Sequence, residues 1–245
     1  MIFEVYQNIE IVFEDNHLLV INKPGRMLSQ GDVTGDEDVQ SILKKYLKEK
    51  YKKPGNVFLA LVQRLDRTVS GLMVLARTSK AASRLSQQIR NQNMEKMYLA
   101  VVESRNIPPG KLVHYLRKDE NQKKAFIVDK PSRHSQKAEL TVHPLQTKGS
   151  FSLIAVLLQT GRFHQIRAQL SAAGMPITGD RKYGGHASTN GTIALMCNKL
   201  SFLHPTRDEA MTFTLPLPNS PPWSRFQPIT QDDLPEVESG HGTGT

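Results

Sequence analysis

The stretch FLALVQRLDRTVSGLMVLA, residues 58–76, places two apolar runs on either side of a short charged segment. Both runs are rich in Leu and Val, so they predict buried strands. Between them Asp66 is flanked by Arg64 and Arg67, and nearby cations favour the charged form of a carboxylate. A carboxylate that stays charged suits a nucleophile, or an anion beside a developing sugar cation. Two interpretations are open: a catalytic carboxylate, or an ion pair at a surface turn, which is the commoner arrangement.

Further strands are predicted on both sides of this stretch, with few helices between them. The expected strands cover 9–14, 17–23, 96–103, 137–145, 151–159, 192–197, 200–204 and 211–215, and a hairpin or loop is expected over 117–124. The expected helices cover 39–51 with Asp38 as N-cap, 78–92 with a Thr or Ser cap, and 163–174 with Gly174 at the C-cap. Strict strand–helix alternation is absent, so we predict a single α+β domain with a large, mainly antiparallel mixed sheet flanked by helices.

The charge of the chain indicates a polyanionic partner. The 245 residues carry a formal charge of +9. The segment 229–245 has four acidic residues and no Lys or Arg, so the remainder is more basic still. Such an excess favours nucleic acid. We predict a folded domain over 1–228 and an acidic, Gly/Thr-rich tail over 229–245 that is disordered.

Several classes of protein are disfavoured by what the sequence lacks. A single cysteine, Cys197, excludes an internal disulfide framework and fits a reducing compartment. No apolar run reaches the ~20 residues of a membrane span, and the N-terminus does not resemble a signal peptide. The eight His residues are scattered, and neither a phosphate-cradle motif nor a G-x-S-x-G elbow is present. We predict a cytoplasmic protein without metal, cofactor or membrane contact.

A second candidate segment is LLQTGRFHQIRAQLSAAG, residues 157–174. A strand, a TGR turn and a helix would gather Arg162, His164 and Arg167 at a helix N-terminus, a position suited to anions. Ile166, Leu170 and Ala173 are expected on the other side of this helix, against the core. In EKMYLAVVE, Tyr98 lies on a predicted strand, where it is either a core residue or a platform for a base.

Together these segments resemble the RluA-type family of RNA pseudouridine synthases. The matching motifs are RLDR-x-x-SG, K-x-Y-x-A-V-V-E, L-x-TGR-x-HQIR-x-x-L, G-x-PI-x-GD-x-KYG and HPT-x-x-E, in family order over roughly residues 10–220. The resemblance implies the pseudouridine synthase fold, with a catalytic domain over 1–228 and an active-site cleft across the sheet. The chain starts at the catalytic-domain hairpin without the S4-like domain of many relatives, so we expect the catalytic domain itself to contact RNA.

The resemblance also implies roles for individual residues. Asp66 matches the catalytic aspartate, and Arg64 matches an arginine that enters the RNA stack where the target base leaves. Tyr98 matches the tyrosine that packs against that base. Arg167 matches the basic partner of the aspartate, and Ile166 matches an apolar residue lining the pocket.

The remaining candidates are assigned to RNA contact. They are Arg67, a structural or phosphate contact, together with Arg162 and His164. Two positions depart from the family pattern: Gln63 replaces a usual His, and Phe163 replaces a common Thr. Neither departure removes a group assigned to chemistry.

The implied reaction breaks the N1–C1′ bond of a flipped uridine and rejoins the base through C5, without a cofactor. Whether Asp66 adds to C1′ or removes a sugar proton is left open, as is the choice between ribosomal and transfer RNA. A non-catalytic RNA-binding or ribosome-assembly protein on the same fold is the alternative. A glycoside or ester hydrolase lacks a matched second carboxylate. A monomer is expected.

Overall fold

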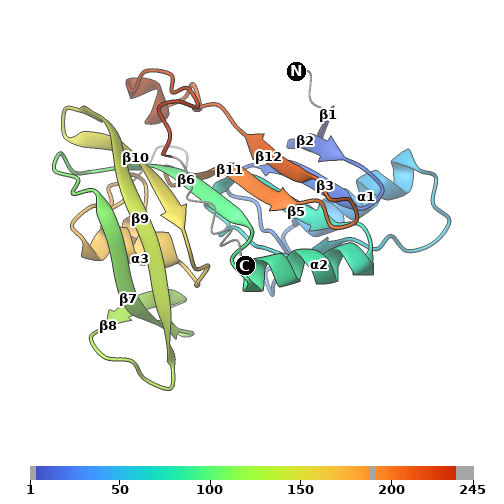
Figure 1. The fold of residues 1–245 in the computed structure, drawn as a ribbon, viewed down its shortest axis with the longest axis horizontal. Coiled ribbons are helices and arrows are strands. Elements are labelled where there is room, and N and C mark those ends of the chain that lie inside the picture. Colours follow the sequence, from blue (N-terminus) through green and yellow to red (C-terminus); the bar gives the residue numbers. More distant parts are fainter. Residues whose placement is uncertain (1–3, 188–190, 236–245) are drawn as a thin grey trace, which may run out of the picture.

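The computed structural model describes residues 4–187 and 191–235 and builds them around one twisted sheet (Figure 1). Its strands are β1 (Glu4–Tyr6), β2 (Ile9–Glu14), β3 (Leu18–Lys23), β4 (Ala60–Leu61), β5 (Ser70–Ala76), β6 (Glu95–Val102), β7 (Gly110–Asp119), β8 (Lys124–Val128), β9 (Ser135–Lys148), β10 (Phe151–Leu158), β11 (Leu195–Leu203) and β12 (Ala210–Thr214). The helices are α1 (Val39–Lys50), α2 (Ser79–Arg90) and α3 (Gln165–Ala172), with short 3₁₀ turns η1 (Arg181–Tyr183) and η2 (Trp223–Arg225).

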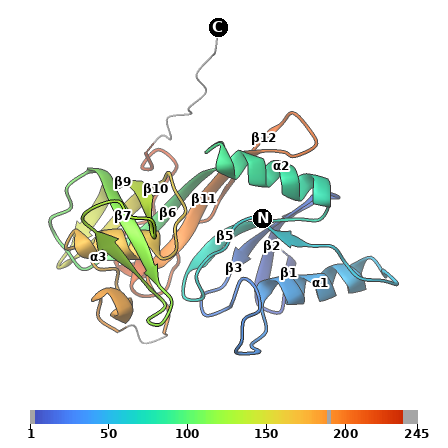
Figure 2. The same cartoon turned by 90° about the horizontal axis from the view of Figure 1, so that it is seen from below.

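The strand order is β1-β2-β3-β5-β11-β6-β10-β9-β7-β8, with β4 paired to β5 and β12 to β11. Among the described strands, the β5–β11 pair is parallel and all other pairs are antiparallel. The predicted mixed, mainly antiparallel α+β fold is therefore confirmed. Figures 1 and 2 show α1 and α2 beside β1–β3 and β5, and α3 beside β7–β10, with β6 and β11 between the two halves.

The helices form where their caps and apolar spacing predict. The Asp38 side chain accepts a hydrogen bond from the Ser41 backbone N–H at the start of α1. Thr78 caps α2 in the same way, by accepting from the Ala81 N–H. Apolar residues at helical spacing then bury one face of α1 against the sheet: Val39, Ile42, Leu43, Tyr46 and Leu47.

Three elements differ from their predicted form. The strand expected over 58–62 is only two residues long as β4, and the strands expected over 192–197 and 200–204 are one continuous β11. The third helix starts at Gln165 instead of residue 163, because His164 has a left-handed backbone with φ of 51°. The prediction that Ala173 packs on the core is wrong, since α3 is buried from Gln165 to Leu170 and then emerges into solvent.

One register row crosses the centre of the sheet. Lys23 of β3 pairs with Gly71, Gly71 pairs with Cys197 of β11, and Cys197 pairs with Tyr98 of β6. Gly71 has φ of +113°, and a Cβ there would lie 2.4 Å from the Cys197 carbonyl oxygen. The position therefore requires glycine. The row brings Tyr98 and Lys23 to the sheet position from which the 62–69 loop emerges.

The predicted tail lies partly within the described residues. Over 229–235, Ile229 and Leu234 pack, partly buried, against the core. Residues 236–245 lie outside the described residues, and the domain boundaries stay a prediction. In the part of the chain that is described, no helix is both long and apolar enough to cross a membrane.

Candidate active site

The loop before β5 holds Asp66 in a fixed position. The Val69 N–H donates to the Asp66 carbonyl at 3.0 Å, closing a turn. The preceding residue, Leu65, is buried; its carbonyl accepts from Ser29 Oγ at 2.7 Å, and its N–H donates to the same hydroxyl at 3.2 Å. These bonds order the backbone around Asp66, whose side chain remains 27% exposed. The carboxylate is thus anchored by its own loop and open to a ligand.

Arg167 of α3 brings the positive charge to this carboxylate. Its Nη1 lies 3.1 Å from Asp66 Oδ2, while Nε and Nη2 donate to the two oxygens of Asp180 at 2.6 and 2.8 Å. The side chains of Arg167 and Asp180 are 7% and 1% exposed. Burial opposes the charge on Arg167, but the hydrogen bonds and charges of Asp180 and Asp66 outweigh it and raise the pKa of Arg167. The bidentate pair with Asp180 therefore fixes the guanidinium that serves Asp66.

The arginines beside Asp66 in the sequence point elsewhere. Arg67 pairs with Asp36 at 2.7 Å, and its Nε donates to the Arg26 carbonyl at 3.2 Å. Arg64 is exposed and has no ion pair or hydrogen bond to any other described residue. The expectation that the flanking arginines stabilise the charge of Asp66 is therefore wrong in its geometry. The cation that contacts Asp66 is Arg167 of α3, which lies far from it in the sequence.

His164 and Tyr183 complete the polar surroundings of Asp66. His164 Nε2 is 3.5 Å from Asp66 Oδ2, and Nδ1 is 3.0 Å from the Tyr183 hydroxyl. Burial, with the neighbouring cations Arg167 and Lys182, lowers the pKa of His164 to about 3, so the ring is neutral and this contact is not an ion pair. From these neighbours we infer the tautomer in which Nδ1 accepts from the tyrosine hydroxyl and Nε2 carries the proton that faces Asp66.

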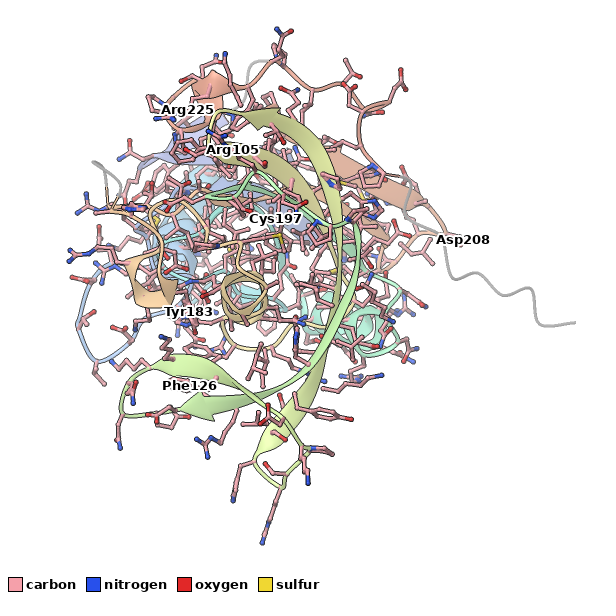
Figure 3. The ribbon with its side chains drawn as sticks, turned by 90° about the vertical axis from the view of Figure 1, so that its left-hand side faces the viewer. Arg105, Phe126, Tyr183, Cys197, Asp208 and Arg225 are labelled. Atoms are coloured by element: carbon pink, nitrogen blue, oxygen red, sulfur yellow. The ribbon has the colours of Figure 1, made fainter. Side chains whose placement is uncertain are left out.

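Tyr183 belongs to a loop that covers one side of the site. Its hydroxyl accepts from the Ala125 N–H of β8 at 2.7 Å, and the Arg167 guanidinium lies 5.0 Å from its ring centre. Lys124 Nζ of β8 lies 4.9 Å from the centre of the Tyr183 ring and 5.4 Å from that of Phe126, and both aromatic residues are labelled in Figure 3. Burial raises the pKa of the Tyr183 hydroxyl to about 12. The ring therefore stays neutral and links α3 to the β7–β8 hairpin.

Tyr98 lies on the sheet row described above, beneath the Asp66 loop. It is buried, and that burial, with Cys197 and Asp66 nearby, raises the pKa of its hydroxyl well above the usual range. The phenol stays protonated at neutral pH. Tyr98 can thus offer an aromatic surface and a hydroxyl, but not a base.

Lys23 is a buried lysine at the end of the strand predicted over 17–23, and no functional role was predicted for it. Its Nζ donates to the carbonyls of Pro24 and Met27 at 2.8 Å each and to that of Arg67 at 3.4 Å. Burial lowers the pKa of Lys23 to about 7, while the Asp66 charge partly opposes that shift. Lys23 therefore joins β3 to the backbone next to Asp66.

The other predicted contacts divide into two groups. Ile166 is buried and belongs to the main core cluster. Arg162 is exposed, and its Nε donates to the Lys137 carbonyl at 3.0 Å. The structure therefore brings His164 and Arg167 to Asp66, but not Arg162, because the left-handed His164 turns the chain between them.

Within residues 4–187 and 191–235, no three His, Cys, Asp or Glu side chains are grouped to share a metal ion. The site offers the Asp66 carboxylate, a fixed guanidinium, a neutral imidazole and a neutral phenol. These groups can bind and stabilise a polar, partly cationic species at the Asp66 carboxylate.

Comparison with known proteins supports one family. The family model described as RNA pseudouridylate synthase matches residues 17–172, which include Asp66, Tyr98 and Arg167. This chain belongs to the RluA-type RNA pseudouridine synthases. An uncharacterized RNA pseudouridine synthase of Bacillus subtilis, YhcT, is 31% identical over 87% of this chain and 70% of its own length. Ribosomal large subunit pseudouridine synthase D of Zymomonas mobilis is 30% identical over 86% of this chain and 69% of its own length.

Two solved structures share the fold of this pseudouridine synthase. Human RNA pseudouridylate synthase domain containing 4 matches with a TM-score of 0.70 and 24% identity, over 85% of this chain and 88% of its own. Human RNA pseudouridylate synthase domain containing 1 matches with a TM-score of 0.65 and 23% identity, over 94% of this chain and 92% of its own. The enzyme class and the fold predicted from the motifs are both confirmed.

Sequence reasoning missed the partner roles of Lys23, Asp180 and Tyr183. Asp180 and Tyr183 lie in the G-x-PI-x-GD-x-KYG motif. A signal for Asp180 existed, because a buried arginine needs more hydrogen-bond acceptors than one carboxylate oxygen. Tyr183 and Lys23 gave no such signal: Tyr183 pairs with the Ala125 backbone and with His164, and Lys23 bonds to backbone carbonyls that any residue could supply.

Proposed function

We propose that this enzyme isomerises specific uridines in structured RNA to pseudouridine, with Asp66 as the catalytic carboxylate. The observation that carries the proposal is the contact between Asp66 Oδ2 and Arg167 Nη1, two residues far apart in sequence that match the family's catalytic pair. The contact is buried on the arginine side and open on the aspartate side. The carboxylate therefore faces a fixed cation on one side and is accessible to a ligand on the other, as reaction at a sugar carbon requires.

The two oxygens of Asp66 have different surroundings. Arg167 Nη1 and His164 Nε2 both face Oδ2, whereas none of the described polar groups is within hydrogen-bond distance of Oδ1. We assign Oδ1 to the ribose of the flipped nucleotide. There it either forms a bond to C1′ as the N1–C1′ bond breaks, or accepts a sugar proton as the base departs. In the first route C5 of the base then bonds to C1′ and displaces the carboxylate; in the second, C5 bonds to C1′ as the carboxylate returns its proton to the sugar. In both routes the base then loses the proton on C5 and gains one on N1, so the isomerisation has no net proton change.

Tyr98 and Arg64 are assigned to the base and to the RNA stack. The neutral Tyr98 ring packs against the detached uracil, an interaction worth roughly 1–3 kcal/mol per stacked base. Arg64 is exposed two residues from Asp66, so it can occupy the gap that the flipped base leaves and offset part of the unstacking cost. Arg67 and Arg162 remain proposed phosphate contacts, and Ile166 a residue lining the pocket.

Ribosomal RNA is the proposed substrate, with transfer RNA as the alternative. Relatives at about 30% identity are named ribosomal large subunit pseudouridine synthase C and D. The formal charge of +9 fits a phosphate-rich partner of either kind. A monomeric, cytoplasmic enzyme without a nucleotide cofactor stays part of the proposal.

The test is to map pseudouridines in total RNA from a strain that lacks the gene, with and without added purified enzyme. We expect one or more ribosomal RNA uridines to lose modification in the strain and regain it with the enzyme alone in buffer. Restoration in transfer RNA instead would correct the substrate. No lost site and no restored site in any RNA would contradict the proposal.

A further inference from the structure

We propose that Phe163 is a stacking platform for an unpaired base next to the flipped uridine, and so helps select the RNA. The proposal rests on the function proposed above and adds to it a residue that contacts a neighbouring nucleotide. Phe163 is not one of the groups assigned to the chemistry.

The position of Phe163 points to a ligand at the mouth of the site. Its ring stacks on the ring of His164, with centroids 3.9 Å apart and an angle of 17° between the planes. His164 in turn lies 3.5 Å from Asp66. Phe163 is 38% exposed, whereas the His164 side chain on which it stacks is only 9% exposed. Exposing a large apolar ring to water is unfavourable, and beside an RNA site such a ring offers a surface on which a base can stack.

The local backbone holds the Phe163 ring in this position. Gln165 accepts hydrogen bonds from Thr160 Oγ1 at 2.7 Å and from the Arg162 N–H at 3.0 Å, which fixes the turn that carries Phe163. His164 is fixed from the other side by its contact with the Tyr183 hydroxyl. A platform that is ordered before binding loses little entropy when a base stacks on it.

A partly exposed cation, Lys118, lies over the Phe163 ring. Lys118 Nζ lies 4.8 Å from the centre of the Phe163 ring and 2.8 Å from Glu120. The Lys118 and Glu120 side chains are 44% and 76% exposed, so both contacts are weak and easily exchanged. A base can replace the ammonium on the ring, and the ammonium can then pair with the phosphate of that nucleotide.

The first test separates stacking from charge. The enzyme carrying Asp66→Asn is titrated with a hairpin RNA whose single-stranded loop is randomised, and with the same hairpin carrying an abasic loop of equal charge. We expect tighter binding to the loop with bases, and Phe163→Leu should reduce that preference by roughly five- to a hundredfold, the range that one stacked base supports. Phe163→Tyr, which keeps the ring, should retain it. An unchanged preference in Phe163→Leu, or no preference at all, would overturn the proposal.

The second test distinguishes a platform from a support for His164. On the RNA that the wild type modifies, Phe163→Leu should raise KM by a similar factor and leave kcat within about twofold. A fall in kcat without a change in KM would mean that Phe163 only positions His164, and would overturn the proposal. Absence of turnover by the wild type would instead contradict the proposed function, while the binding test still decides the role of Phe163.

Discussion

Two arginine–aspartate pairs lie near Asp66; their nitrogen–oxygen distances are alike, but their burial and their contact with Asp66 differ. Arg67 pairs with Asp36 at 2.7 Å, with side chains 47% and 48% exposed. Arg167 pairs with Asp180 at 2.6 Å, with side chains 7% and 1% exposed. The first arginine is next to Asp66 in the sequence but does not contact it, whereas the second is about a hundred residues away and does. Adjacency in the sequence therefore says little about which charge serves a site.

Burial decides what each pair contributes. An exposed ion pair is screened by water and salt, and contributes about 0–1 kcal/mol. A buried pair is costly to break, because the remaining charge is left without a partner in a medium of low polarity. The Arg167–Asp180 pair also orients a third group, the Asp66 carboxylate, so its loss reaches the chemistry as well as the stability.

The largest effect on stability is expected for Asp180→Ala. This change leaves Arg167 buried with only the half-exposed Asp66 nearby, so the free energy of unfolding should fall by about 3–5 kcal/mol. Pseudouridine formation should fall as well, because the guanidinium loses two of its three fixed contacts. Urea denaturation gives the first quantity and single-turnover kinetics the second. A loss below about 1 kcal/mol would show that the two pairs are equivalent.

Arg167→Lys tests whether the geometry of the charge matters. Lysine keeps the charge but cannot reach Asp180 and Asp66 together with a planar fork. We expect a rate about a hundredfold lower, the usual cost of displacing a group in a site by about 1 Å. The measurement is single-turnover pseudouridine formation, with Arg67→Lys as the matched control at near wild-type rate. Equal rates for both variants would refute the distinction drawn between the two arginines.

Lys23 sharpens the comparison, because it is buried and bonded only to carbonyl groups. Its pKa is lowered to about 7, whereas an unfolded chain holds that proton up to about 10.4. Between these values the unfolded state binds more protons, so stability should rise with pH by up to about 1.4 kcal/mol per unit and be flat below pH 7. Denaturation of wild type and Lys23→Met at several pH values gives the difference curve. A difference that does not change from pH 7 to 9 would contradict a lowered pKa for Lys23.

The smallest effect is expected for Asp36→Ala, which removes the exposed partner of Arg67. Stability should change by less than about 1 kcal/mol, and the rate of pseudouridine formation should stay within a few-fold of wild type. Urea denaturation and the same kinetic assay measure both. A loss as large as that of Asp180→Ala would mean that the 26–38 loop supports the site through this pair.

Periodicity and capping residues predicted most of the fold. Local sequence patterns predicted the α1 helix, its Asp38 cap and the strands around Asp66, and in the structure the apolar residues of these patterns are buried. The parallel contact between β5 and β11 could not be predicted, because it joins segments more than a hundred residues apart. The left-handed His164 also gave no local signal, and it explains why Arg162 turns away and why α3 starts late.

The sequence predicted less of the site than of the fold. Asp66, Tyr98 and Arg167 were grouped by their resemblance to family motifs, and no spacing rule would have placed them together. The roles of Asp180 and Lys23 depend on their burial. Sequence alone does not reveal whether a charged residue in a loop or at a strand end is buried. Side chains that bond to the backbone of distant segments are the hardest to predict, since any residue can supply a carbonyl.

The most direct test is single-turnover pseudouridine formation by Asp66→Asn on an RNA that the wild type modifies, with RNA binding measured in the same samples. Asparagine keeps the size of the side chain but removes its charge. We expect no detectable pseudouridine, with a Kd for RNA within a few-fold of wild type. Formation of pseudouridine by this variant at a rate near that of wild type would contradict the account.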